Sequence, residues 1–332
     1  MSPAGTRPAL SVRPFSDEDY PRLVAWFAQA YAPRARGEAE LRHGDAILPE
    51  GHRRWRFVAE LDGRPVGYVE VGHNLGSFHP ERYELDLAVQ LDARGRGAGS
   101  ALFQAAEASA LEAGARRLRV FLPVDGLGYA FAQRRGFVET KREWEFLLNL
   151  AEFAADAFAE VEARVAARGV QVAPLSSFPD TPDTRRRLFD LFTDVRRDVP
   201  RAEPASELSF EFFERSHWDD VGFRPDGWML ALAPEDAAGN REWVGLSTLW
   251  ESAAPGLLDT GLTAVKRDWR RQGVAMALKV AALRWARAQG FERVRTDTDS
   301  LNVGMAAVND LLGFQRQPAW ASLAKDLPGA DR

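Results

Sequence analysis

The chain contains no cysteine, and only four of its 43 basic residues are lysines. Without cysteine it can form no disulfide, no zinc-thiolate site and no thiol nucleophile. The formal net charge of −5 argues against a nucleic-acid partner, which would require a concentrated basic face. No apolar run is long enough to span a membrane, and residues 1–10 hold two prolines and nothing like a signal peptide. We therefore expect a cytoplasmic protein without a membrane partner.

The chain does contain a long internal repeat. Its first copy, the first loop, reads Arg94-Gly95-Arg96-Gly97-Ala98-Gly99, and the second loop reads Arg270-Arg271-Gln272-Gly273-Val274-Ala275. The two loops start 176 residues apart (270 − 94). Each is followed by a small-residue helix that ends at a glycine, and later by Gly-Phe, at 136–137 and 313–314. A repeat of this length that holds its register predicts two copies of one domain.

The repeat sets the expected domain organisation. At 332 residues and 45% hydrophobic content, the chain suits two domains of ordinary size. We predict a first domain over 1–150, a connecting helix over 151–169 and a second domain over 170–332. In both halves the hydrophobic pattern indicates a strand, a helix, a hairpin, a strand entering the loop, and the loop helix, followed by another strand.

A strand that ends in a glycine-containing turn and opens a helix directs several backbone N–H groups at one spot. The positive end of the helix dipole lies at the same spot, so the loop can hold a polyphosphate. The P-loop of nucleotide hydrolases requires Gly-Lys-Ser/Thr, which neither copy has. The dinucleotide fingerprint requires an acidic residue after the next strand, and the first copy has Pro123 there.

On these residues the chain resembles the GNAT superfamily of N-acetyltransferases. The signature Gln/Arg-x-x-Gly-x-Gly/Ala is present at 94–99 and 270–275, and the later Asn-x-x-Met segment is present from Asn302 to Met305. The resemblance covers nearly the whole chain and implies an α/β (α+β) fold. It implies two tandem GNAT-like acyl-CoA N-acyltransferase domains, each a mixed, mostly antiparallel sheet flanked by helices.

The resemblance also implies acetyl-CoA or another acyl-CoA as donor and no metal. The pyrophosphate would lie on the loop amides, and the strand before each loop would pair with the pantetheine arm. The implied binding residues of the first half are Ala88, Val89, Arg94, Gly95, Arg96, Gly97, Ala98, Gly99 and Ser100. Those of the second half are Ala264, Val265, Arg270, Arg271, Gln272, Gly273, Val274, Ala275, Asn302 and Asn309.

The two halves depart from the family pattern in different ways. Many members carry a tyrosine as general acid four residues before the Gly-Phe glycine, where this chain has Ala132 and Asn309. Tyr129 lies about one turn earlier in the first half and is a possible substitute. We expect the second half to bind acetyl-CoA, because its loop and its Asn302 segment are both present. The first half is a second candidate, because its loop is richer in glycine.

Acyl transfer to an amine requires a base near the amine and a donor at the developing oxyanion. Glu84 stands ten residues before Arg94, where some family members carry a base, and Asp86 lies on the same face of the strand. The competing interpretation of Glu84 and Asp86 is that the start of this strand is solvated and that both carboxylates are merely exposed. In the second half Thr260 matches Glu84, and Asp259 would need a one-residue bulge to point inward. Glu251, at the end of the preceding strand, is a further candidate.

We therefore predict an N-acetyltransferase that transfers an acetyl group to a small-molecule amine by direct attack. A non-catalytic acyl-CoA-binding or regulatory protein is the alternative, motivated by the missing tyrosine in both halves. An enzyme like mycothiol synthase, which is also a tandem member, is a further alternative. The five histidines show no metal-binding spacing. Monomer and homodimer both remain open, as do the acceptor and the length of the acyl group.

Overall fold

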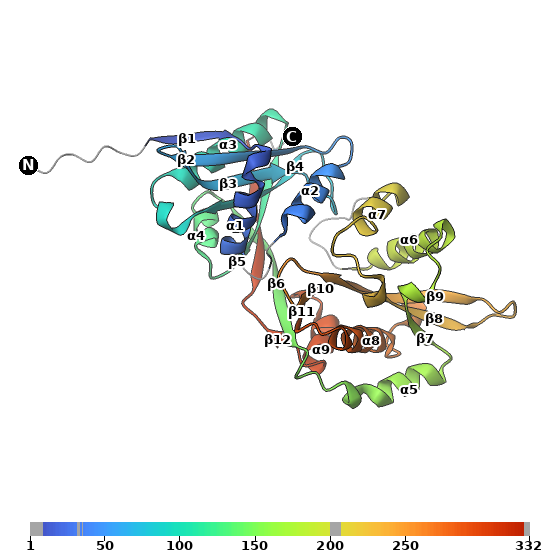
Figure 1. Cartoon of the computed structure of the whole chain (residues 1–332). Coiled ribbons are helices and arrows are strands. Elements are labelled where there is room, and N and C mark those ends of the chain that lie inside the picture. Colours follow the sequence, from blue (N-terminus) through green and yellow to red (C-terminus); the bar gives the residue numbers. More distant parts are fainter. Residues whose placement is uncertain (1–8, 32–33, 35, 200–206, 329–332) are drawn as a thin grey trace, which may run out of the picture. The chain divides into compact units, whose positions relative to one another are not determined.

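The computed structural model describes residues 9–31, 34, 36–199 and 207–328 (Figure 1). Within them the chain forms two compact units. The first unit contains residues 9–141 and 321–328, and the second contains 142–199 and 207–320.

This grouping differs from the division expected near residue 150. Strand β6 (Val138–Asn149) pairs along residues 143–149 with β11 (Arg293–Asp299), so most of it belongs to the second unit. Strand β13 (Trp320–Asp326) lies beside β5 (Arg117–Pro123) in the first unit. The ion pair between Arg117 and Asp326, at 2.6 Å, joins these two strands. A sequence repeat reveals equivalent segments, but strand pairing depends on residues far apart in the chain.

The sheet of the first unit has the order β1-β2-β3-β4-β5-β13. Its remaining strands are β1 (Leu10–Pro14), β2 (Arg54–Leu61), β3 (Arg64–Gly72) and β4 (Arg82–Val89). The pairs from β1 to β4 are antiparallel, and β4 pairs with β5 in parallel. The sheet is therefore mixed, as the resemblance implied.

Helices cover both faces of this sheet because its strands carry large side chains on both. Tyr68 of β3 packs under α1 (Tyr20–Ala30), where its ring stacks on Trp26 with centroids 5.9 Å apart. The next residue, Val69, points to the other face and joins the core formed with α3 (Ala98–Glu112). Helix α2 (Glu38–Ala46) packs beside α1, and the short α4 (Leu127–Gln133) packs against β5.

The second unit repeats this arrangement. Its sheet has the order β6-β11-β10-β9-β8-β7, with the two-residue β12 (Gln315–Arg316) paired to β6. The other strands are β7 (Gln171–Pro174), β8 (Met229–Glu235), β9 (Arg241–Glu251) and β10 (Leu257–Val265). One core includes α8 (Val274–Ala288), and another includes α6 (Pro182–Arg196) and α7 (Phe210–His217). Helices α5 (Ala159–Ala167) and α9 (Val303–Leu311) complete the unit.

In both units the strand entering the loop separates from its parallel neighbour. Strand β4 pairs with β5 only over three residues, ending at Glu84 and Arg119. Strand β10 pairs with β11 only over three residues, ending at Asp259 and Arg295. Beyond these points the backbone of β4 and of β10 has no strand partner on that side, which leaves a gap directly before each loop.

Candidate active site

The two loops share one unusual backbone conformation. Gly95 and Gly97 have φ values of 76° and 94°, and Arg271 and Gly273 have 56° and 86° at the matching positions. Gly97 and Gly273, the glycines that both loops share, are the N-caps of the following helices, α3 and α8. Left-handed conformations suit glycine and cost a residue with a Cβ about 1 kcal/mol. The repeated glycines are therefore required by the turn, and Arg271 is held in it under strain.

The arginine that opens each loop anchors the loop to the strand before it. Arg94 Nε donates to the carbonyl oxygen of Val89 at 3.0 Å, and Arg270 Nε donates to that of Val265 at 2.9 Å. Sequence reasoning assigned these arginines to donor binding alone. The bonds show that each also fixes the turn where the strand ends.

A cavity of about 850 Å³ lies along the gap between β4 and β5 in the first unit. We call it the groove. It runs from the first loop to Tyr31, the residue after α1. Seven residues expected to bind the donor line it, namely Ala88, Val89, Arg94, Gly95, Gly97, Gly99 and Ser100. Ala98 is only 1% exposed and belongs to the core. Arg96 is exposed on the loop and is not part of the lining.

Sequence reasoning missed two arginines at the groove. Arg134 and Arg135 both line it from the end of α4. Arg135 donates to Ser100 Oγ at 2.7 Å, and its guanidinium lies 3.4 Å from the centroid of the Phe131 ring. Burial lowers the pKa of Arg135 from its usual value. The signal in the sequence is a basic pair directly before Gly136-Phe137, which the second half lacks.

The second loop is covered by side chains of its own unit. A Cβ on Gly273 would lie 3.3 Å from Val161 and 3.3 Å from Val165, both on α5. Gln272 accepts a hydrogen bond from Arg168, the residue after α5, at 2.6 Å. The segment expected to be a connecting helix therefore packs on the loop that it precedes in sequence.

Arg270 of the second loop and Arg267, three residues before it, already hold a carboxylate. Asp198 forms ion pairs with both Arg267 and Arg270, and these two arginines hold the pKa of Asp198 below its usual value. In contrast, no ion pair with a described carboxylate involves Arg94, Arg96 or Arg134 in the first unit. The first loop thus presents Arg94 and Arg96 to a phosphate, whereas Arg270 at the place of Arg94 in the second loop is already paired with Asp198.

The remaining candidates of the second half have structural partners. Asn302 is the N-cap of α9, and its side chain accepts from the backbone N–H of Met305 at 3.2 Å. Asn309 is fully buried and donates to Thr298 Oγ1 at 3.0 Å. Ala264 and Val265 lie at the end of β10, and Val274 and Ala275 begin α8.

A buried lysine marks a further difference between the halves. Lys279 stands 176 residues after Phe103 (279 − 103), which lines the groove of the first unit. Its side chain is 3% exposed, with Nζ 5.3 Å from the centroid of the Phe314 ring. Burial lowers the pKa of Lys279 to about 8. A charge thus replaces an aromatic ring at the equivalent point of the second unit.

The two carboxylates of β4 lie in different surroundings. Glu84 accepts from Asn74 at 2.8 Å and lies 3.6 Å from Arg119, with 43% of its side chain exposed. Burial raises the pKa of Asp86 to about 6, with Glu70 and Glu84 adding to the rise and Arg36 opposing it. Asp86 is thus the carboxylate whose protonation can change close to neutral pH.

The second unit has a carboxylate at the place of Glu84. Strand β10 contains a one-residue bulge between Thr260 and Thr263, so its start is shifted by one residue relative to β4. As a result Asp259 pairs with Arg295 at 2.7 Å, as Glu84 does with Arg119. The bulge that sequence analysis named as a condition is present. Glu251, at the end of β9, is half-exposed and paired with Arg224.

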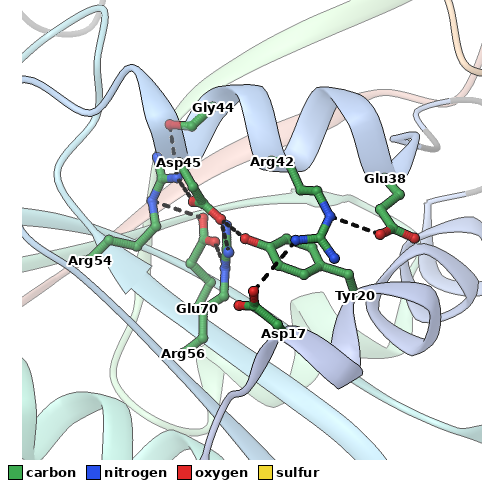
Figure 2. Close-up of polar contacts among 9 residues, drawn as sticks. All are labelled: Asp17, Tyr20, Glu38, Arg42, Gly44, Asp45, Arg54, Arg56 and Glu70. Atoms are coloured by element: carbon green, nitrogen blue, oxygen red, sulfur yellow. Dashed lines mark hydrogen bonds and ion pairs between the residues drawn. The ribbon is translucent and has the colours of Figure 1, made fainter.

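An ionic network ties α1 and α2 to strands β2 and β3 of the first unit (Figure 2). Asp45 of α2 binds both Arg54 and Arg56 of β2 and accepts from Tyr20 of α1. Arg56 also binds Glu70, which lies directly opposite Asp86 in the register of β3 and β4. Helix α1, whose last residues Gln29 and Ala30 line the groove, is therefore tied to α2 and through it to the strands.

Two other expectations concern Tyr129 and metals. The Tyr129 hydroxyl donates to Glu139 at 2.6 Å, and Tyr129 does not line the groove. Within the described residues no cluster of three histidines or carboxylates could hold a metal ion. No helix in that part of the chain is long and apolar enough to cross a membrane.

The family model described as "Acetyltransferase (GNAT) family" matches residues 20–137 and 190–314. No curated protein gives a significant match. Among solved structures, a GCN5-related N-acetyltransferase from Sphaerobacter thermophilus is 17% identical, covers 97% of each chain and has a TM-score of 0.69. A tandem GNAT protein from the clavulanic acid biosynthesis pathway is 19% identical, covers 96% of this chain and 98% of its own, and has a TM-score of 0.72. At these identities the likeness shows the tandem fold alone.

Proposed function

Because the chain belongs to the acetyltransferase (GNAT) family, we propose that it is an acetyl-CoA-dependent N-acetyltransferase with a small-molecule amine as acceptor. We further propose that the first unit holds the donor. The observation that carries this assignment is the groove of about 850 Å³, which joins the first loop to the gap beside β4. It replaces the expectation that the second half is the main donor site, because α5 and Asp198 occupy the second loop.

The first loop fits the pyrophosphate of the donor. The turn through Gly95 and Gly97 leaves the N–H groups at the start of α3 without Cβ atoms in front of them. Arg94, Arg134 and Arg135 surround this end of the groove. The pantetheine arm would lie along β4, whose pairing with β5 ends at Glu84 and whose edge on that side then borders the groove. An extended arm can form hydrogen bonds there as a strand would.

The chemistry proposed is direct attack of the amine on the thioester. A backbone N–H of β4 near Val89 that points away from β3 can stabilise the oxyanion, since that side of the strand borders the groove beyond Glu84. Asp86, with its pKa of about 6, is ionised at neutral pH and can take up the proton that the amine loses. Glu84 is the second candidate, but its contacts with Asn74 and Arg119 stabilise the ion and weaken it as a base.

A small acceptor is supported by the enclosure of the groove's inner end. Tyr31 lines that end, is only 8% exposed and directly follows α1, which the network of Figure 2 fixes through Tyr20. A similar fold occurs in a fungal glucosamine N-acetyltransferase region, which is 13% identical, covers 97% of this chain and 38% of its own, and has a TM-score of 0.70. That similarity makes glucosamine a reasonable test compound.

A panel of amines tests the proposal. We would incubate the protein with acetyl-CoA and glucosamine, spermidine, tyramine or lysine, and follow release of the CoA thiol. Turnover with at least one amine, lost in Asp86→Asn, is the expected result. Acetyl-CoA binding without turnover of any amine would instead favour a non-catalytic acyl-CoA-binding protein, which Ala132 and Asn309 at the tyrosine positions also motivate. A panel extended to aminoacyl thiol precursors would test for an enzyme like mycothiol synthase.

A further inference from the structure

A tyrosine outside every expected motif closes the inner end of the groove. Tyr31 directly follows α1, and its backbone N–H donates to the carbonyl of Phe27 at 2.8 Å. Its ring packs against that of Phe27, with centroids 5.8 Å apart. Together with Leu85 and Leu87 of β4, Tyr31 lines the cavity. A ring held this way presents its hydroxyl group in a defined place.

The Tyr31 hydroxyl is hydrogen-bonded to the carboxylate of Asp86. Asp86 does not line the groove, whereas Tyr31 does. A molecule in the groove therefore meets the tyrosine first, and the carboxylate lies behind it. The arrangement is a two-member chain that leads from the cavity into the protein.

The charges around this pair suit a proton that moves inward and later returns. Asp86 faces Glu70 and Tyr68 of β3, Glu84 of β4, and Arg36. Glu84 is in turn paired with Arg119 of β5. Burial raises the pKa of Asp86 to about 6 and the pKa of Tyr31 well above its usual value. At neutral pH the carboxylate is thus ionised while the phenol keeps its proton, so Tyr31 can pass a proton on without storing one.

We propose that Tyr31 is a catalytic residue that relays the proton of the attacking amine to Asp86. This inference rests on the proposed function. As the amine nitrogen bonds to the thioester carbon, a proton leaves the nitrogen for Tyr31 Oη, and the hydroxyl proton of Tyr31 passes to Asp86. The carbon–sulfur bond breaks and CoA leaves as the thiolate. The thiolate takes a proton from water, and the protonated Asp86 returns one to water, so protons and electrons balance.

Removal of one oxygen atom tests the relay. Tyr31→Phe keeps the ring and its packing and removes only the hydroxyl group. With the amine from the panel that turns over fastest, we expect kcat to fall about 100-fold while the dissociation constant of acetyl-CoA stays within about threefold of wild type. Tyr129→Phe, in which the lost hydroxyl group binds Glu139 outside the groove, is the matched control and should keep the wild-type kcat.

A double variant separates a relay from two independent effects. Because the two residues act in series, Tyr31→Phe combined with Asp86→Asn should be no slower than the slower single variant. If the loss of kcat in the double variant equals the product of the two single losses, the relay is wrong. In the wild type kcat/KM should fall as the pH drops below about 6, because Asp86 becomes protonated. This fall should disappear in Tyr31→Phe, an effect that a packing role of Tyr31 would not produce.

The outcomes distinguish this inference from the proposed function. Turnover that persists at the wild-type rate in Tyr31→Phe rejects the relay and leaves the acetyltransferase intact. Acetyl-CoA binding without turnover of any amine rejects the enzyme and the relay together.

Discussion

Single side chains show that the two halves of this chain have diverged. Asp86 of the first half is a carboxylate whose pKa is raised by burial to about 6. The matching region of the second half holds Leu262, which has no titratable group. Phe103 lines the groove of the first half, and Lys279 stands in its place in the second. Differences of this kind decide which copy can do chemistry.

Lys279 provides a stability test at the scale of one residue. Its pKa falls from 10.5 to about 8 on folding, so the charged form is disfavoured in the folded state. The resulting cost is fully present below pH 8 and disappears as the pH rises to 10.5. Lys279→Met should therefore raise the free energy of unfolding of the second unit at pH 7 by roughly 1–3 kcal/mol, and by much less at pH 10.

Denaturant unfolding at the two pH values measures this effect. Lys266→Met is the control, because Lys266 is ion-paired with Glu242 at the surface and its removal should give no gain. A loss of stability in Lys279→Met at pH 7 would show that the buried ammonium is a stabilising group.

At the scale of the element, helix α5 distinguishes the two loops. Both Gly97 and Gly273 have positive φ, so alanine at either position costs about 1 kcal/mol in backbone strain. At Gly273 the new Cβ would also press on Val161 and Val165, whereas at Gly97 it meets only the tip of Leu10, at 3.4 Å. Gly273→Ala should therefore cost about 1–2 kcal/mol more than Gly97→Ala.

Hydrogen exchange of the two loop helices, α3 and α8, compares the two variants directly. Gly273→Ala should cost less in a Val165→Ala background than in the wild type, since that background lacks one of the two methyl contacts. Equal costs for the two single variants would mean that α5 does not press on the second loop.

The helices, strands and loop turns were largely predictable from the sequence. The side chains that pack over the second loop were not. The loop turns depend on local chemistry, since glycine takes positive φ where other residues are strained, and Gly97 and Gly273 can be recognised without a structure. The bulge in β10 was foreseen as a condition on Asp259. The ion pair between Asp198 and Arg270 joins residues 72 apart in sequence, so no local pattern reveals it.

At the scale of the whole molecule, a strand from the last part of the sequence, β13, completes the sheet of the first unit. Strand β13 contributes Ala321 and Leu323, both fully buried, to the core of the first unit. A chain that ends at residue 319 should therefore lose the protection of β5 and β3 against hydrogen exchange, because burial of Leu323 alone stabilises by about 2 kcal/mol.

A chain that ends at residue 328 is the control for this truncation. It keeps β13 with its ion pairs from Lys325 to Glu107 and from Asp326 to Arg117. Peptides of α8 in the second unit should stay protected in both chains. Full protection of β5 without β13 would show that the first unit does not need the C-terminal strand. The sequence repeat alone could not reveal this pairing, because it aligns the halves and is silent on which strands pair.

We propose that acetyl-CoA binds to the first of the two loops and not to the second. Gly99 lines the groove in helical backbone, and a Cβ there would make ordinary contacts of 3.5 Å with Phe131, so Gly99→Val should fold and narrow the site. Ala275→Val is the equivalent change in the second loop. Calorimetric titration of acetyl-CoA should give one site per chain, abolished by Gly99→Val and unchanged by Ala275→Val. Binding that survives Gly99→Val and is lost in Ala275→Val would mean that the second loop, and not the first, holds the donor.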